Sequence, residues 1–265
     1  MDYAKNIKYL KGSGNKFNPI RHLLDIYFPE DYIGLADVLI FIHGGSWSHG
    51  NKEQYKQLGK TLAEKNIVSV LINYRLAPEV NFEGMGLDCA AAVKWVYENI
   101  EQFGGDPEKI FLSGYSSGGH LAGLITLNPE FFNRVHAKNI VKGCILIDAF
   151  GLCLSEFQKK HDSSYLMKQF DDIFTPDPDN WKRASPVEYI SENDVPFLIF
   201  TGENSPLPLR YDNKYFVDEM KKRNKPVFYE LMAGKSHLQM ITQLEDKTNS
   251  MYKKIINFMT AKVEV

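Results

Sequence analysis

Cysteine is scarce in this sequence. The 265 residues include three cysteines, Cys89, Cys144 and Cys153. Their number is odd, they lie in or beside apolar stretches, and they lack the C-x-x-C spacing found in many zinc and redox sites. A disulfide framework and a zinc site are therefore not indicated, and we expect reduced thiols in a cytoplasmic protein.

Long apolar runs and an excess of charge of one sign are also lacking. The N-terminal residues do not form the apolar core of a signal peptide, and no segment approaches the length of a membrane span. The formal net charge of −2 provides no basic field for nucleic acid or anionic lipid. We therefore expect neither a membrane nor a nucleic-acid partner, whereas the oligomeric state stays open, a homodimer included.

The remaining composition is that of a globular α/β protein. Apolar residues make up 44% of the chain, and no Pro/Ser-rich linker or charge block divides it, so we expect one domain over residues 1–265. Short apolar runs such as 37–42, 68–73 and 143–147 alternate with helical patterns such as that from about 85 to 103. This alternation predicts a mostly parallel central sheet with helices on both faces.

Two regions depart from the alternation. Residues before about Arg21 are polar, and we expect them to be irregular. The stretch of about 149–195 is too long for a simple loop, and we expect it to form a cap or lid after the sixth strand. Its side chains Tyr165, Met167, Phe170 and Phe174 either line a pocket or pin the insertion to the sheet.

The most informative stretch is 111–120, where a buried strand runs into an apolar helix through G-x-S-x-G with Ser116 at its centre. A serine on such a strained turn projects its hydroxyl clear of the sheet, and glycines two residues away on either side let neighbouring backbone pass. We predict that Ser116 is a nucleophile. The amide of Ser117, at the start of the helix, is placed to donate to an oxyanion.

A second glycine motif, at residues 43–47, directly follows the strand 37–42. Backbone amides of Gly44 or Gly45 can approach a ligand there that any side chain would exclude, so we expect one of them to complete the oxyanion hole. We expect His43 to fix this loop by hydrogen bonding. Trp47 is either a core anchor or a wall of the acyl pocket.

A general base is predicted at His237, which follows the last strand, 227–231, and so reaches the carboxyl edge of the sheet. We expect His120, one helical turn after Ser116, to pack beneath the turn as a hydrogen-bonded core residue. A triad also requires a carboxylate that orients the imidazole.

The expected place for that carboxylate is the loop after the strand 196–200, which contains Glu203 and Asn204. Asn204 stands where an aspartate is expected, but asparagine in this role can cost about ten-thousand-fold in rate. We therefore favour Glu203 as the acid and keep Asn204 as the next candidate. Asp148 and Asp212 are the remaining alternatives.

Taken together, these motifs resemble the α/β-hydrolase superfamily, specifically its esterase and lipase-like branch with H-G-G-x-W before G-x-S-x-G. The resemblance covers most of the chain from about Asp25 onward. It is carried by residues 43–47, 73–78, 105–107, 114–119 and 236–237. Residues 204–206, Asn-Ser-Pro, are similar to the Asp-Ser-Pro of the related kynurenine formamidases. The resemblance implies an α/β-hydrolase fold and a carboxylic ester hydrolase without metal or cofactor.

Three functions are compatible with these residues. The first is hydrolysis of small carboxylic esters through an acyl-enzyme, with Ser116 as the nucleophile and His237 as the base. The second is arylformamidase chemistry on N-formylkynurenine, which uses the same groups and differs in the pocket. The third is ligand binding without catalysis on a hydrolase scaffold.

Overall fold

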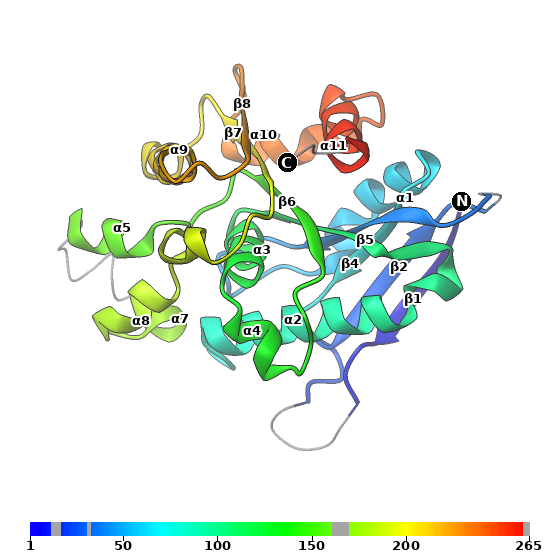
Figure 1. Ribbon diagram of the computed structural model, residues 1–265, viewed down its shortest axis with the longest axis horizontal. Helices are drawn as coiled ribbons and strands as arrows, with labels where there is room; N and C mark the ends of the chain where they lie inside the picture. The colour runs from blue at the N-terminus through cyan, green and yellow to red at the C-terminus, as the bar shows by residue number, and fades with distance from the viewer. Residues whose placement is uncertain (12–16, 31–32, 161–169, 262–265) are drawn as a thin grey trace.

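The central element is an eight-stranded sheet (Figure 1). The computed structural model describes residues 1–11, 17–30, 33–160 and 170–261. The strand order is β1-β2-β4-β3-β5-β6-β7-β8. The strands are β1 (Asp2–Lys8), β2 (Leu23–Phe28), β3 (Ala36–Ile42), β4 (Val68–Ile72), β5 (Gly105–Tyr115), β6 (Val141–Ile147), β7 (Phe197–Gly202) and β8 (Val227–Met232).

Strand direction agrees with the sequence-based expectation of a mostly parallel sheet. Neighbouring strands from β4 through β3 and β5 to β8 pair in parallel, whereas β2 pairs antiparallel with both β4 and β1. All five residues of β4 are buried, as expected for a strand that helices cover on both faces. The carboxyl ends of the parallel strands therefore meet at one edge, where the loops after them come together.

Helices cover both faces of the sheet (Figure 1). One apolar layer includes α2, α3 and α9, and the other includes α1, α10 and α11. The helices outside the insertion are η1 (Lys52–Tyr55), α1 (Lys56–Glu64), α2 (Phe82–Asn99), η2 (Ile100–Phe103), α3 (Ser117–Leu127), α4 (Glu130–Arg134), α9 (Leu207–Lys222), α10 (His237–Thr242), η4 (Gln243–Glu245) and α11 (Ser250–Thr260).

Strand β1 was not expected from the sequence. It pairs with β2 at the edge of the sheet, with Asp2 opposite Phe28 and Lys8 opposite Leu23. None of its seven side chains is fully buried, so the sequence lacks the apolar alternation by which strands are recognised. Backbone hydrogen bonds to β2 hold this strand, and the prediction of irregular structure before Arg21 was wrong for residues 2–8.

The insertion between β6 and β7 contains α5 (Leu154–Lys160), α7 (Asp171–Phe174), α8 (Pro178–Arg183) and η3 (Pro186–Glu192). Phe174 is fully buried, and its ring lies 5.1 Å from that of Trp47 and 5.2 Å from that of Trp181. Phe174 therefore pins the insertion to the rest of the fold. Tyr165 and Met167 lie outside the described residues.

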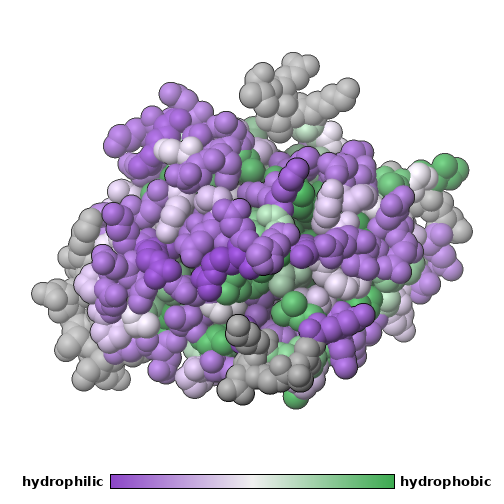
Figure 2. All heavy atoms as spheres, turned by 60° about the horizontal axis from the view of Figure 1, so that its bottom comes forward, coloured by the Kyte–Doolittle hydropathy of each residue, from purple (hydrophilic) through white to green (hydrophobic). Residues whose placement is uncertain are grey.

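The surface is mainly polar on the face shown in Figure 2, where apolar side chains are scattered in small areas. Of the helices in the described ranges, none combines the length and apolar character that crossing a membrane requires.

Candidate active site

Ser116 lies on the turn between β5 and α3 with a positive φ of 53°. Its amide donates to the carbonyl oxygen of Ile147 at 3.1 Å, which ties the turn to the end of β6. A Cβ atom at Gly114 would overlap the backbone of Gly118, and one at Gly118 would overlap the carbonyl oxygen of Ile42. Glycine is therefore required at both positions, for the steric reason that the G-x-S-x-G spacing suggested.

His237 is the first residue of α10, directly after the β8 turn. Its Nε2 lies 3.1 Å from Ser116 Oγ, within reach of a proton transfer. The imidazole stacks on the ring of Tyr115, with centroids 4.8 Å apart and planes 24° apart. The Tyr115 hydroxyl also donates to the backbone oxygen of His237 at 2.9 Å. Strand β5 thus leads directly into Ser116 and, through its last residue Tyr115, also holds the histidine opposite it.

The carboxylate beside the histidine is Asp148, directly after β6. Its Oδ2 lies 2.7 Å from His237 Nδ1, and its side chain is fully buried. Oδ2 also accepts a hydrogen bond from Ser205 Oγ at 2.5 Å, and Oδ1 accepts one from the Gly202 amide at 2.9 Å. These donors give both carboxylate oxygens of Asp148 hydrogen-bond partners in a buried position.

The sequence-based preference for Glu203, and for Asn204 after it, is corrected by this geometry. Glu203 Oε2 accepts a hydrogen bond from the Gly234 amide at 2.7 Å, and Asn204 Nδ2 donates to the Gly234 oxygen at 3.1 Å. The Ser205 amide bonds back to the Gly202 oxygen at 3.1 Å, so the chain turns at once after β7. That turn directs both side chains to the loop between β8 and α10 and leaves the place beside His237 to Asp148.

Asp212, the other alternative, has a different set of partners. Its carboxylate accepts hydrogen bonds from the amides of Gly151, Leu152 and Cys153 at 2.7 to 2.8 Å. Burial raises the pKa of Asp212 to about 6, although these three amides favour the ionised form. Asp212 therefore fixes the beginning of the insertion to α9.

Of the three amides proposed for an oxyanion hole, those of Gly45 and Ser117 remain available. The Gly44 amide donates to the Tyr55 hydroxyl at 3.2 Å, so it is already engaged. Gly45 has a φ of 132°, and within the described residues its amide makes no hydrogen bond. Ser117 is the first residue of α3, where a helix leaves its amides without intrahelical partners. Of the two glycines left open by the sequence, the structure thus favours Gly45.

His43 holds the glycine loop in place, as the sequence suggested. Its Nδ1 lies 2.8 Å from the Gly44 oxygen, which identifies Nδ1–H as the donor. The imidazole stacks on Tyr74 with centroids 4.5 Å apart, and Tyr74 donates its hydroxyl proton to the His43 oxygen at 3.0 Å. Burial lowers the pKa of His43 to about 4, so the ring is neutral near pH 7.

Trp47 is a core anchor, with an exposed fraction of 1%. Its Nε1–H donates to His120 Nδ1 at 3.0 Å, and His120 Nε2–H donates to the Ala184 oxygen at 2.7 Å. His120 is therefore a hydrogen-bonded core residue, as its position one helical turn after Ser116 indicated. Burial lowers its pKa to about 4. This pair connects α3 and the glycine loop to the insertion.

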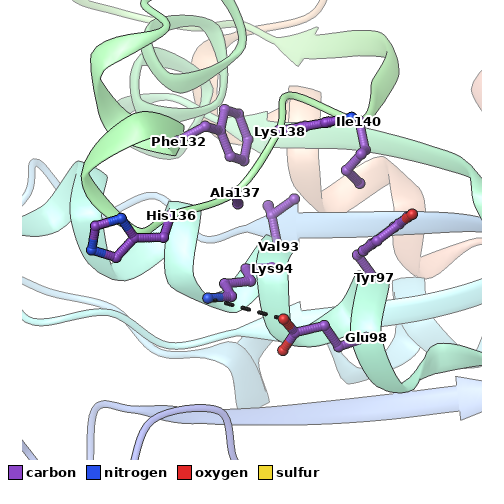
Figure 3. Close-up of a pocket in the computed structure, with 9 residues that line it drawn as sticks. All are labelled: Val93, Lys94, Tyr97, Glu98, Phe132, His136, Ala137, Lys138 and Ile140. Atoms are coloured by element: carbon purple, nitrogen blue, oxygen red, sulfur yellow. Dashed lines mark ion pairs between the residues drawn. The ribbon is translucent and has the colours of Figure 1, made fainter.

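Two of the cavities formed by described residues differ in their relation to these side chains. One, of about 280 Å³, lies between α2 and residues 132–140 (Figure 3). Lys94 and Glu98, one turn apart on α2, form an ion pair with Nζ and Oε1 4.0 Å apart, and neither Ser116, His237 nor Asp148 is among the described residues that line it. The other, of about 240 Å³, is bordered by Tyr55, Tyr115 and Leu238, which adjoin the glycine loop, Ser116 and His237.

Among the described residues, no group of three or more His, Cys, Asp or Glu side chains is arranged to bind a metal ion.

A serine, a histidine and an aspartate at the carboxyl edge of a mostly parallel, helix-covered sheet define an α/β-hydrolase. Within this class, the chain belongs to the BD-FAE family, whose sequence model matches residues 24–212.

Curated relatives carry esterase names. The chain is 28% identical over 245 residues to isoprenylcysteine alpha-carbonyl methylesterase ICME of Arabidopsis thaliana, covering 84% of this chain and 55% of the relative. It is 30% identical over 218 residues to the probable carboxylic ester hydrolase LipM of Mycobacterium tuberculosis, covering 78% of this chain and 50% of the relative. The chain thus spans about half the length of these relatives.

Solved structures share the fold. Esterase B from Lactobacillus rhamnosis superposes with a TM-score of 0.83 at 18% identity, covering 97% of this chain and 86% of that one. A truncated carbohydrate esterase from gut microbiota superposes with a TM-score of 0.82 at 19% identity, covering 98% and 95%. At this level of identity the likeness establishes the α/β-hydrolase architecture.

Proposed function

We propose that this chain is a serine hydrolase that cleaves small carboxylic esters through an acyl-enzyme intermediate. The observation that carries the proposal is the unbroken series of hydrogen bonds from Ser116 Oγ through His237 to the buried Asp148, at 3.1 and 2.7 Å. The esterase names of the relatives support it.

In the first half of the reaction, Ser116 Oγ attacks the carbonyl carbon while His237 Nε2 takes the hydroxyl proton. The charge that develops on the carbonyl oxygen is stabilised by the amides of Gly45 and Ser117. His237 then gives the proton to the departing alcohol, and the acyl group stays on Ser116. Asp148 accepts the Nδ1–H hydrogen bond, which selects the productive tautomer and stabilises the imidazolium.

In the second half, a water molecule takes the place of the alcohol. His237 removes its proton as the water oxygen attacks the acyl carbon, and the same two amides stabilise the second oxyanion. Collapse of this intermediate returns the proton to Ser116 Oγ and releases the acid. The cycle calls for no cofactor and no metal.

The other sequence-based expectations stay predictions. Arylformamidase activity would use the same residues, and comparing turnover of N-formylkynurenine with that of short esters distinguishes the two reactions. A binding protein without activity is disfavoured by the hydrogen bonds that join Ser116, His237 and Asp148. The cap formed by about 149–195, the cytoplasmic location and the homodimer also stay predictions.

The test is covalent labelling with a fluorophosphonate, followed by mass spectrometry of the digested protein. We expect one adduct, on the peptide that contains Ser116, no adduct in Ser116→Ala, and cleavage of p-nitrophenyl acetate that disappears in the same variant. Folded wild-type protein that is neither labelled nor active on this ester would contradict the proposal.

A further inference from the structure

The cavity of about 240 Å³ lies between the first turns of α1 and the helix α10. It is smaller than the roughly 300–1,000 Å³ of clefts that enclose a whole drug-sized ligand. The cavity is therefore large enough for a single substituent of a substrate, while the bond that reacts lies outside the cavity.

Three of the residues that line the cavity adjoin or contact the proposed catalytic residues or the glycine loop. Tyr115 precedes Ser116 and stacks on the imidazole of His237. The Tyr55 hydroxyl accepts the hydrogen bond of the Gly44 amide in the glycine loop. Leu238 directly follows His237 in α10. The cavity is thus bounded by groups that fix the nucleophile, the oxyanion loop and the base, whereas the cavity in Figure 3 has no such connection.

The walls are chemically suited to an uncharged apolar group. The apolar side chains Leu58, Leu238, Ile241 and Leu244 line the cavity together with the uncharged polar side chains Gln54, Gln57 and Thr242, and Glu245 is the charged residue among its described lining. Leu238 is 66% exposed, so an apolar group in the cavity can cover it. A carboxylate in this cavity would be repelled by Glu245, and an alkyl or aromatic group would gain from burial.

The placement of the base decides which end of an ester would lie here. The leaving oxygen has to approach His237 Nε2 to receive its proton, while the carbonyl oxygen turns to Gly45 and Ser117. The alcohol group is therefore the part of the ester on the His237 side. Residues 238–245, which follow His237, form one wall of the cavity.

We propose that this cavity binds the alcohol group of the ester and selects esters of apolar, uncharged alcohols. The inference rests on the proposed function, because it assigns a specificity site to that reaction. Leu238 and Thr242, both exposed residues of α10 that line the cavity, then determine how large an alcohol is accepted.

The experiment measures kcat/KM for two substrate series with Leu238→Trp and Thr242→Trp. In one series the acyl group is acetyl and the alcohol grows from methanol to benzyl alcohol. In the other the alcohol is p-nitrophenol and the acyl chain grows. We expect both variants to lower the ratio of benzyl to methyl acetate at least tenfold and to leave the acyl-chain ratio unchanged. Ile140→Trp, in the cavity of Figure 3, is the matched control and should change neither ratio.

The proposal is overturned if the benzyl-to-methyl ratio stays constant in both tryptophan variants, or if the acyl-chain ratio falls instead. Fluorophosphonate labelling of Ser116 is measured in the same samples. Unlabelled wild-type protein would count against the proposed function itself, whereas labelled protein with unchanged alcohol preference would count only against the subsite.

Discussion

Tyr115 occupies the variable position before Ser116, the proposed nucleophile, and it contacts His237, the proposed base, through both its ring and its hydroxyl. Its ring stacks on the imidazole of His237, and its hydroxyl donates to the His237 backbone oxygen at 2.9 Å. Because Tyr115 adjoins Ser116 in the chain, it fixes the base relative to the nucleophile. Small errors in such an arrangement lower the rate considerably. Tyr115 is thus a positioning residue.

We expect Tyr115→Phe to lower kcat on p-nitrophenyl acetate roughly two- to tenfold with little change in KM, the effect of losing a hydrogen bond worth about 0.5–1.5 kcal/mol. Tyr115→Leu, which also removes the stacked ring, should lower kcat further. Tyr252→Phe is the matched control, since Tyr252 also donates to a backbone oxygen, that of Leu244, at 2.5 Å. It should lower the free energy of unfolding and spare kcat. Equal kcat for Tyr115→Phe and wild type would refute this role.

Residue patterns in the sequence singled out Ser116 and His237, which the structure brings within 3.1 Å of each other, but they favoured Glu203 over Asp148, the carboxylate that lies beside His237. Ser116 has a local motif, and His237 follows from chain order and the end of a strand. Asp148 also follows a buried strand directly, but nothing local distinguishes it from a turn residue. The Asn-Ser-Pro at 204–206 led to the prediction that the loop after β7 supplies the acid. That loop does reach Asp148, but through Ser205, which donates a hydrogen bond to the carboxylate.

At the scale of elements, the connection from β5 to α3 is shaped by the space around its glycines. A Cβ at Gly118 would overlap the backbone oxygens of Ile42 and His43 at the end of β3. This close approach brings the glycine loop next to Ser116, where the proposed oxyanion site lies. Gly123, later in the same helix, would place a Cβ 3.5 Å from a Leu152 side-chain carbon, an ordinary contact.

Gly118→Ala should therefore destabilise the protein by several kcal/mol or prevent folding, because backbone cannot move aside as a flexible side chain can. Gly123→Ala is the control in the same helix. It should be neutral or stabilising by up to about 1 kcal/mol, since alanine has the higher helix propensity. Thermal unfolding followed by circular dichroism measures both. A stable Gly118→Ala protein with full activity would contradict the role assigned to this contact.

Strand and helix positions followed from periodicity where burial was strong, as in β3, β4 and α2. The edge strand β1 could not be recognised because its side chains are largely exposed and backbone pairing leaves no trace in residue type. The sequence indicated which aromatic residues of the insertion pack inward or line a pocket, but not which side chains they contact. The contact of Phe174 with Trp47 joins segments more than 120 residues apart, and no local pattern specifies such a pair.

At the scale of the whole molecule, two buried neutral histidines make stability depend on pH. Burial lowers the pKa of His43 and of His120 to about 4, against about 6.5 in an unfolded chain. Between these values the unfolded state binds more protons, so each histidine lowers the free energy of unfolding as the pH falls from about 6.5 to 4. Asp212, with its pKa raised to about 6, acts in the opposite direction over much of this window.

A comparison of variants separates these contributions. His120→Asn keeps an acceptor for Trp47 Nε1–H but cannot titrate. We expect wild type to exceed this variant in unfolding free energy most at pH 7, and the difference to shrink steadily towards pH 4. Urea unfolding at several pH values measures it, and Asp212 cancels because both proteins contain it. A difference that stays constant over this range would show that His120 is not held neutral by the fold.

The identity of the triad acid is decided by kcat/KM on p-nitrophenyl acetate for Asp148→Asn and Glu203→Gln. We expect Asp148→Asn to reduce this constant by roughly ten-thousand-fold, because asparagine favours the wrong imidazole tautomer, while circular dichroism shows the fold intact. Glu203→Gln keeps an acceptor for the Gly234 amide and should stay within about threefold of wild type. Full activity in Asp148→Asn together with a large loss in Glu203→Gln would contradict the assignment of Asp148 as the acid.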